Sequence, residues 1–298
     1  MEQKNLKHYI KTLTANRRTC LLLLVFFVLF SAADRLFSLF NTLAYISTAL
    51  TLVVSVIITS GLYIYITRPH IPHFFRINKI KSSDAFLWFF LGICANCAIT
   101  IINIPLNKLF SSFMSLPQVV EAPKSFGEYV LGILCIAIVP AIFEELFCRA
   151  IVLREYERYG SRFAIVASAL AFLILHNSLA SSLSMLILGL ILAFIVTCTD
   201  SIFPAMIFHF SINFFSLTIN YISESIIPPH IQPEFALMLN IVFMMLALVF
   251  LLNIAAVLPD GLRKINAKKR AKISRFGFSF SLIIIILIYI STQLKYFI

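Results

Sequence analysis

Charge is scarce in this chain. Only 12% of its 298 residues are Asp, Glu, Lys or Arg, whereas 60% are hydrophobic, and the mean hydropathy is +0.97. A soluble domain is about half apolar and about a quarter charged. The composition therefore excludes a soluble globular protein and predicts an integral membrane protein, in which the 30 Phe residues fit a lipid-facing surface.

Glycine and tryptophan are scarce as well, and two familiar motifs are missing. Eight Gly and one Trp do not indicate a glycine-rich nucleotide loop. The six Cys lie in or beside apolar segments, so the disulfide framework of a small extracellular domain is not expected. Cys94 and Cys97 form a CxxC pair in the middle of an apolar run, and we interpret them as small packing residues. The HExxH helix that is typical of zincins is absent.

Long apolar runs are abundant. A run of about 20 residues is long enough to cross a bilayer as a helix. Nine such runs predict an all-α, polytopic transmembrane helix bundle. The basic start of the chain followed by an apolar run resembles a signal peptide, but the many later runs favour an uncleaved first helix. The predicted spans are 19–40, 43–66, 84–105, 127–153, 161–180, 181–198, 201–222, 234–258 and 277–294.

The positive charges are distributed unevenly around these spans. With a cytoplasmic N-terminus, 19 of the 24 Lys and Arg lie in cytoplasmic segments, which are 1–18, 67–83, 154–162, 199–200 and 259–276. Because Lys and Arg concentrate in cytoplasmic loops, this predicts a multi-pass protein of the cell membrane with its N-terminus inside. The same rule accounts for the net charge of +11. We interpret the basic run Arg263–Arg275 as a topology anchor that touches anionic lipid, and we expect no nucleic-acid partner.

Ionisable residues inside predicted spans indicate function, because such residues are rare in lipid. Asp34 and Arg35 lie near the outer end of the first span, and three spans in the second half of the chain carry polar groups at depth. They are Glu144, Glu145 and Arg149 in the fourth span, His176 in the fifth, and His209 with Asn213 in the seventh. Glu145 and Arg149 are four residues apart, so they share a helix face and can form an ion pair. Glu144 points about 100° away and is left as the free carboxylate.

This set of side chains fits peptide-bond hydrolysis by an activated water. A carboxylate and a His can together hold and deprotonate a water. His209 and Asn213 can donate hydrogen bonds to a developing oxyanion. Two His with one or two Glu are also a donor set for zinc, so a metal site at Glu144, His176 and His209 stays open. Two other interpretations stay open: a proton-coupled transporter, and a bundle in which these groups only stabilise packing.

Three motifs occur in order on successive polar spans. EELFCR (Glu144–Arg149) has the pattern EExxxR, FLILH (Phe172–His176) has FxxxH, and HFSIN (His209–Asn213) has HxxxN. Over residues 124–222 the chain thereby resembles the CAAX prenyl protease and bacteriocin-processing (CPBP) family of intramembrane proteases. The expected parts of the chain are N-terminal spans in 1–123, a protease core in 124–222 and two C-terminal spans in 223–298.

The resemblance implies an α-helical intramembrane endopeptidase that acts on a peptide or membrane-protein substrate in the lipid bilayer. The implied catalytic residues are Glu144, Glu145, His176, His209 and Asn213, with Arg149 and Phe172 in support. In this scheme Glu144 activates the water with His176 as its partner, and His209 and Asn213 form the oxyanion site. Which glutamate is the base stays open, as does the choice between a glutamate-type and a zinc-dependent metallo-type enzyme.

The family is broad, and this leaves the substrate open. Some members cut prenylated CAAX proteins, and many bacterial relatives are linked to bacteriocin maturation or self-immunity. The resemblance is therefore also compatible with a non-catalytic immunity or scaffold protein. One geometric tension remains. Counted at 1.5 Å per residue from the cytoplasmic edge, Glu144 and His209 lie about 15 and 12 Å deep, but His176 lies about 21 Å deep. We therefore expect the fifth span to tilt or to begin outside the bilayer.

Overall fold

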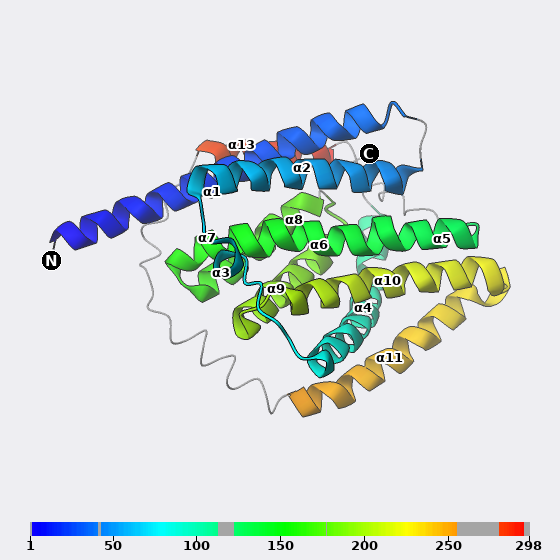
Figure 1. Cartoon of the computed structure of the whole chain (residues 1–298). Helices are drawn as coiled ribbons and strands as arrows, with labels where there is room; N and C mark the ends of the chain where they lie inside the picture. Colours follow the sequence, from blue (N-terminus) through cyan, green and yellow to red (C-terminus); the bar gives the residue numbers. More distant parts are fainter. Residues whose placement is uncertain (1, 41–42, 113–121, 177, 255–279, 295–298) are drawn as a thin grey trace.

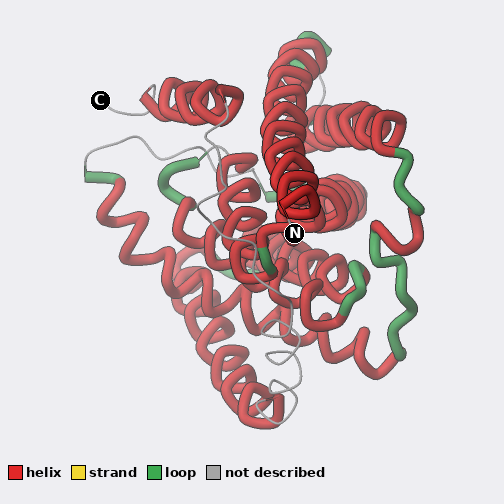
Figure 2. Tube along the Cα trace, turned by 90° about the vertical axis from the view of Figure 1, so that its left-hand side faces the viewer, coloured by secondary structure: helices red, strands yellow, loops and turns green. Residues whose placement is uncertain are grey.

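The computed structural model describes residues 2–40, 43–112, 122–176, 178–254 and 280–294. Within these residues every regular element is a helix, so the predicted all-α architecture is confirmed for this part of the chain (Figures 1 and 2). The longer helices are α1 (Glu2–Phe37), α2 (Ala44–Thr67), α4 (Ser82–Phe110), α8 (Ser161–His176), α9 (Ser182–Thr199), α10 (Phe203–Ile226), α11 (Gln232–Ile254) and α13 (Phe280–Leu294). Two short helices, α3 (Ile71–Phe74) and η4 (Pro229–Ile231), lie in connections.

Most of these helices are suited to a membrane. Six segments are long and apolar enough to cross it: Asn16–Phe37, Ala44–Thr67, Ser82–Phe110, Phe126–Tyr159, Ser182–Thr199 and Phe203–Ile226. Two shorter apolar helices are Ser161–His176 and Ile283–Leu294. These eight segments, together with α11, lie at the nine predicted spans. The chain is a multi-pass membrane protein, while the number of crossings and their direction stay predictions. The basic run Arg263–Arg275 lies outside the described residues.

The segment Phe126–Tyr159 forms one long rod of changing helical pitch. Its pieces are α5 (Phe126–Gly132), the π-helix η1 (Ile133–Ile138), α6 (Val139–Glu145), the π-helix η2 (Leu146–Leu153), α7 (Arg154–Tyr156) and the 3₁₀-helix η3 (Glu157–Tyr159). π-Helical turns are rare and are frequent at functional sites. Here two of them flank α6, the piece that ends with Glu144 and Glu145.

Glycines let neighbouring helices approach closely. At Gly92 in α4, an added Cβ would lie 1.8 Å from Ser211 Oγ and 2.4 Å from the carbonyl oxygen of Phe208, both in α10. At Gly189 in α9, an added Cβ would lie 2.9 Å from the Cα atom of Ala169 in α8. Small residues at such contacts are how membrane helices gain packing area, since lipid provides no hydrophobic driving force between helices. These contacts hold α4 against α10 and α9 against α8.

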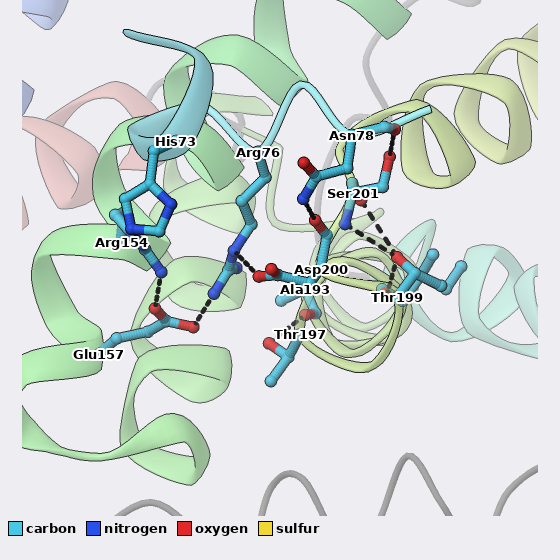
Figure 3. A network of polar contacts seen from close by, with 11 residues as sticks. His73, Arg76, Asn78, Arg154, Glu157, Ala193, Thr197, Thr199, Asp200 and Ser201 are labelled. Atoms are coloured by element: carbon cyan, nitrogen blue, oxygen red, sulfur yellow. Dashed lines mark hydrogen bonds and ion pairs between the residues drawn. The ribbon is translucent and has the colours of Figure 1, made fainter. Parts of the chain in front are cut away.

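Three connections meet at one end of the bundle (Figure 3). Arg76 is buried there, with Nη2 2.5 Å from Glu157 Oε1 and Nε 2.8 Å from Asp200 Oδ1. Asn78 in the same connection donates a hydrogen bond to the Asp200 carbonyl oxygen at 2.5 Å. We call Arg76, Glu157 and Asp200 the Arg76 clasp. Its three residues come from segments that the charge pattern places on the same side of the membrane, so their meeting agrees with that arrangement.

Candidate active site

The three motifs converge on one oxygen of Glu144. Glu144 Oε2 lies 3.7 Å from Nε2 of His176, the last residue of α8, and 4.0 Å from Nε2 of His209 in α10. This oxygen is buried and has no hydrogen-bond partner among the described residues. The Glu144 side chain as a whole keeps 14% of its surface exposed. The Glu144 carboxylate is therefore partly exposed, has one oxygen without a hydrogen-bond partner among the described residues, and faces two imidazole rings.

Both rings are held at Nδ1, which leaves Nε2 for Glu144. His176 Nδ1 lies 2.9 Å from the carbonyl oxygen of Phe172, one turn earlier in α8. His209 Nδ1 lies 3.0 Å from Glu145 Oε1. Carbonyl and carboxylate oxygens only accept hydrogen bonds, so each Nδ1 carries a proton and donates it. In the neutral rings, each Nε2 is then an acceptor that faces Glu144. The same type of Nδ1 contact fixes ring orientation in many enzyme sites.

Glu145 and Arg149 form the ion pair that their spacing predicts, and this prediction is confirmed. Arg149 Nη1 donates to Glu145 Oε1 at 2.9 Å, and both side chains are fully buried. Arg149 Nη2 also donates to the carbonyl oxygen of Gly189 in α9 at 3.4 Å. Two buried charges are tolerated only when they compensate each other and are hydrogen-bonded. Arg149 and His209 thus share Glu145 Oε1, while Glu145 Oε2 is buried and has no hydrogen-bond partner among the described residues.

Phe172 lies in contact with three of these groups. Its ring centroid is 4.4 Å from that of His176 and 5.8 Å from that of His209. The guanidinium carbon of Arg149 lies 4.3 Å over the same ring. A cation above an aromatic face is attracted by the ring quadrupole, more strongly when both are away from water. Phe172, itself fully buried, is placed to orient both His rings and Arg149.

Asn213 contacts the rod through the carbonyl group that Pro140 leaves unpaired. Pro140 has no N–H, so the carbonyl oxygen of Ile136, four residues earlier, lacks its usual helical donor. Asn213 Nδ2 donates to that oxygen at 3.1 Å. The sequence predicted an oxyanion role for Asn213. The structure gives the turn at Pro140 a partner in α10, and the oxyanion role stays a prediction.

The donors around Glu144 match zinc in chemistry but not in arrangement. Carboxylate and imidazole are zinc ligands that bind at about 2.0–2.2 Å. Within the described ranges, no group of three or more His, Cys, Asp or Glu is arranged to hold a metal ion. The residues as placed do not form a metal centre, and the chemistry proposed for this site uses no metal ion.

Sequence reasoning did not find two of the contacts that build this site. The Gly189 carbonyl oxygen holds Arg149, and the Ile136 carbonyl oxygen holds Asn213. Backbone acceptors carry no residue-type signal, and only the missing N–H of Pro140 pointed toward the second contact. The counted depth of His176 also gave no indication that its ring reaches Glu144.

The rod, α8, α9 and the first half of α10 have a counterpart among known proteins. Residues 126–215 match the family model described as type II CAAX prenyl endopeptidase Rce1-like. This matched segment contains all three motifs, EExxxR, FxxxH and HxxxN. No curated protein and no solved structure matches the chain.

Proposed function

We propose that this Rce1-like protein is an endopeptidase that hydrolyses a peptide bond with a water activated by Glu144 and His176. The main observation behind this proposal is that Glu144 Oε2 has no hydrogen-bond partner among the described residues and lies 3.7 Å from His176 Nε2. That separation is too long for a direct hydrogen bond and is short enough for one water to bridge. The water donates one hydrogen to each acceptor and attacks the carbonyl carbon as its proton passes to Glu144. Glu144 then returns that proton to the leaving amine.

Burial supports Glu144, and not Glu145, as the base. Glu145 is fully buried, and its Oε1 already accepts from Arg149 and His209. A general base must come within hydrogen-bond reach of the proton that it takes. Glu144 meets this condition because its side chain is partly exposed and has an unpaired oxygen. We assign Glu145 and Arg149 to the positioning of His209.

His209 and Asn213 are proposed to stabilise the oxyanion. Asn213 uses one amide hydrogen for Ile136, and an amide nitrogen carries two, so one is available to a substrate. His209 donates from Nε2 as the imidazolium, with its Nδ1–H held by the Glu145 carboxylate. Donors placed where charge develops contribute most to such reactions when water is excluded. We place the protease core in residues 124–222 and propose CAAX-type or bacteriocin-related processing as its use.

The test is cleavage by the full-length protein in detergent or vesicles, with a prenylated CAAX peptide and candidate bacteriocin precursors as substrates. We expect Glu144→Gln to lower kcat by about 10²- to 10⁴-fold, the usual contribution of a general base. Glu128→Gln is the matched control, because Glu128 lies only partly buried in the first turn of the same rod and a glutamine there can still accept the hydrogen bond from the Lys124 N–H. Both variants should keep the unfolding midpoint of the wild type.

Other outcomes of this test point to the other functions. A Glu144→Gln protein that cleaves as fast as wild type contradicts the assignment of the base. An immunity or scaffold protein is indicated by two results together. Neither the wild type nor the variants cleave any substrate, and alanine at Glu144, His176 and His209 leaves the cellular phenotype unchanged. Proton flux in proteoliposomes that is abolished by the same substitutions indicates a transporter.

A further inference from the structure

A second polar site lies away from Glu144, at the end of the bundle where the Arg76 clasp is found. A cavity of 510 Å³ opens there between the start of the α1 span, the end of α2, the α3 connection and the end of the rod. Its wall includes four basic side chains, Arg18, His70, His73 and Arg158, and the rings of Tyr63 and Phe74. Arg158 is 14 residues beyond Glu144, about 20 Å along the rod, so the two sites are separate.

The cavity has an excess of positive charge. No Asp or Glu is among the residues that line it. The acid next to it is Glu155, which is buried behind the wall and accepts hydrogen bonds from Arg158 Nη2 at 3.1 Å and from the Tyr63 hydroxyl at 2.6 Å. Glu155 Oε2 lies 3.7 Å from Arg18 Nη2. One carboxylate therefore balances two guanidinium groups, and about one positive charge is left over before any contribution from His70 and His73.

The wall also offers hydrogen-bond donors that the protein does not use. Arg18 Nε is buried and has no hydrogen-bond partner among the described residues. His73 Nε2 lies 3.4 Å from Arg154 Nη2 (Figure 3). Arginine only donates, so Nε2 of His73 accepts and its Nδ1 carries the hydrogen. The site thus combines fork-shaped guanidinium donors, an imidazole donor and apolar rings.

We propose that this cavity binds a phosphate group attached to a small organic body, either an anionic phospholipid headgroup or a soluble phosphate ester. Guanidinium groups match phosphate oxygens in pairs and bind them with charge-assisted hydrogen bonds. Basic pockets between transmembrane helices at the membrane surface are suited to lipid headgroups, and the rings of Phe74 and Tyr63 suit a glycerol or acyl portion. The bound phosphate holds the α3 connection against α1 and the rod. This inference does not depend on the function proposed for Glu144.

The experiment measures thermal unfolding of the full-length protein in a nonionic detergent. The probes are dioctanoyl phosphatidylglycerol, dioctanoyl phosphatidylcholine and inorganic phosphate. A ligand that binds only the folded state raises the unfolding midpoint with its concentration. A saturable rise with phosphatidylglycerol, with a much smaller effect of phosphatidylcholine, identifies a lipid headgroup. A saturable rise with inorganic phosphate alone identifies a soluble ligand. Either result supports the site.

Variants separate this cavity from general attraction to a basic protein. His70→Glu puts a negative charge into the wall at an exposed position, so the fold is expected to tolerate it. Like charges that meet at a binding site weaken binding, and we expect the apparent Kd to rise at least about tenfold. Ser82→Glu makes the same change of charge at an exposed position outside the cavity and should keep the wild-type Kd.

A third variant, Arg158→Gln, should also weaken binding at least about tenfold, because it removes one guanidinium group. The proposal is overturned if neither phosphatidylglycerol nor inorganic phosphate raises the midpoint of the wild type. It is equally overturned if His70→Glu binds the probe as tightly as wild type and Ser82→Glu.

Discussion

Glu144 and Glu145 are adjacent residues with opposite surroundings. Consecutive residues of a helix point about 100° apart, so one carboxylate can be fully buried in the core while its neighbour stays partly exposed. Glu145 is fixed by Arg149 and His209, whereas Glu144 Oε2 has no partner among the described residues. The buried ion pair makes the charge of Glu145 tolerable, and this leaves Glu144 available for chemistry.

A prediction at the residue scale concerns Asn213. Asn213→Ala should destabilise the protein by about 1–3 kcal/mol, because the Ile136 carbonyl oxygen then has no donor in a buried setting. In a Pro140→Ala background, the restored N–H of residue 140 can take over that carbonyl, and the penalty should become smaller. Unfolding of the four proteins of this double-mutant cycle measures the difference. Equal penalties in both backgrounds would show that Asn213 does not serve this carbonyl.

At the scale of elements, the site depends on changes of pitch and on close helix contacts. The π-helices η1 and η2 flank α6, and η1 contains the Ile136 carbonyl group that bonds to α10. In α4 and α9, Gly92 and Gly189 bring α10 and α8 within backbone contact. Because α8 and α10 carry His176 and His209, these contacts help to place the two His residues.

Gly92→Ala is therefore expected to destabilise the fold. A Cβ there would overlap both Ser211 Oγ and the Phe208 carbonyl oxygen, and backbone cannot move away as a flexible side chain can. The matched control is Gly61→Ala in α2, where nothing lies within 4 Å of the added Cβ. Alanine is the better helix former by roughly 0.5–1 kcal/mol, so the control should be neutral or stabilised. Shifts of the unfolding midpoint from wild type in opposite directions would confirm the contact. A Gly92→Ala protein as stable as the Gly61→Ala control would disprove it.

At the scale of the whole molecule, the Arg76 clasp joins the end of the rod to the turn before α10. Glu157 follows the glutamates by little more than three turns, and Asp200 precedes His209. One buried guanidinium group therefore ties both elements of the site at the same end of the bundle. The cavity lined by His70 and His73 lies in the same connection as Arg76, so the polar features of this end form one region.

Arg76→Gln should lower the free energy of unfolding by about 1.5–3 kcal/mol, because the buried Glu157 carboxylate keeps Arg154 as a partner but loses its charge-assisted hydrogen bond from Arg76. Most of the loss comes from Glu157, because Asp200 is 60% exposed and water can solvate it. Lys79→Gln is the control, as Lys79 lies exposed in the same connection. Denaturant or thermal unfolding in detergent measures both, and equal stability of the two variants would contradict a role for the clasp.

The sequence by itself determined the class of the protein and the local contacts of its site. Lipid satisfies no backbone polar group, so a chain this apolar must form helices, and the described residues confirm that. The spacing of four between Glu145 and Arg149 was enough to predict their ion pair. The ordered motifs lie within the segment that matches the Rce1-like family model. All of these features depend on neighbours along one helix or on composition.

Only the tertiary structure decided which groups meet across helices. Counting residues put His176 deeper in the membrane than Glu144 and His209. In the structure, however, the rings of His176 and His209 both face Glu144 Oε2. Counting along separate helices ignores where each helix starts and how it leans on its neighbours. Those positions follow from packing at sites such as Gly189 and from backbone acceptors such as the Ile136 carbonyl oxygen, which local sequence patterns do not reveal. The position of the Glu144 carboxylate away from Arg149 was predictable from one helix. That the imidazoles of His176 and His209 face this carboxylate could be seen only in the packed bundle.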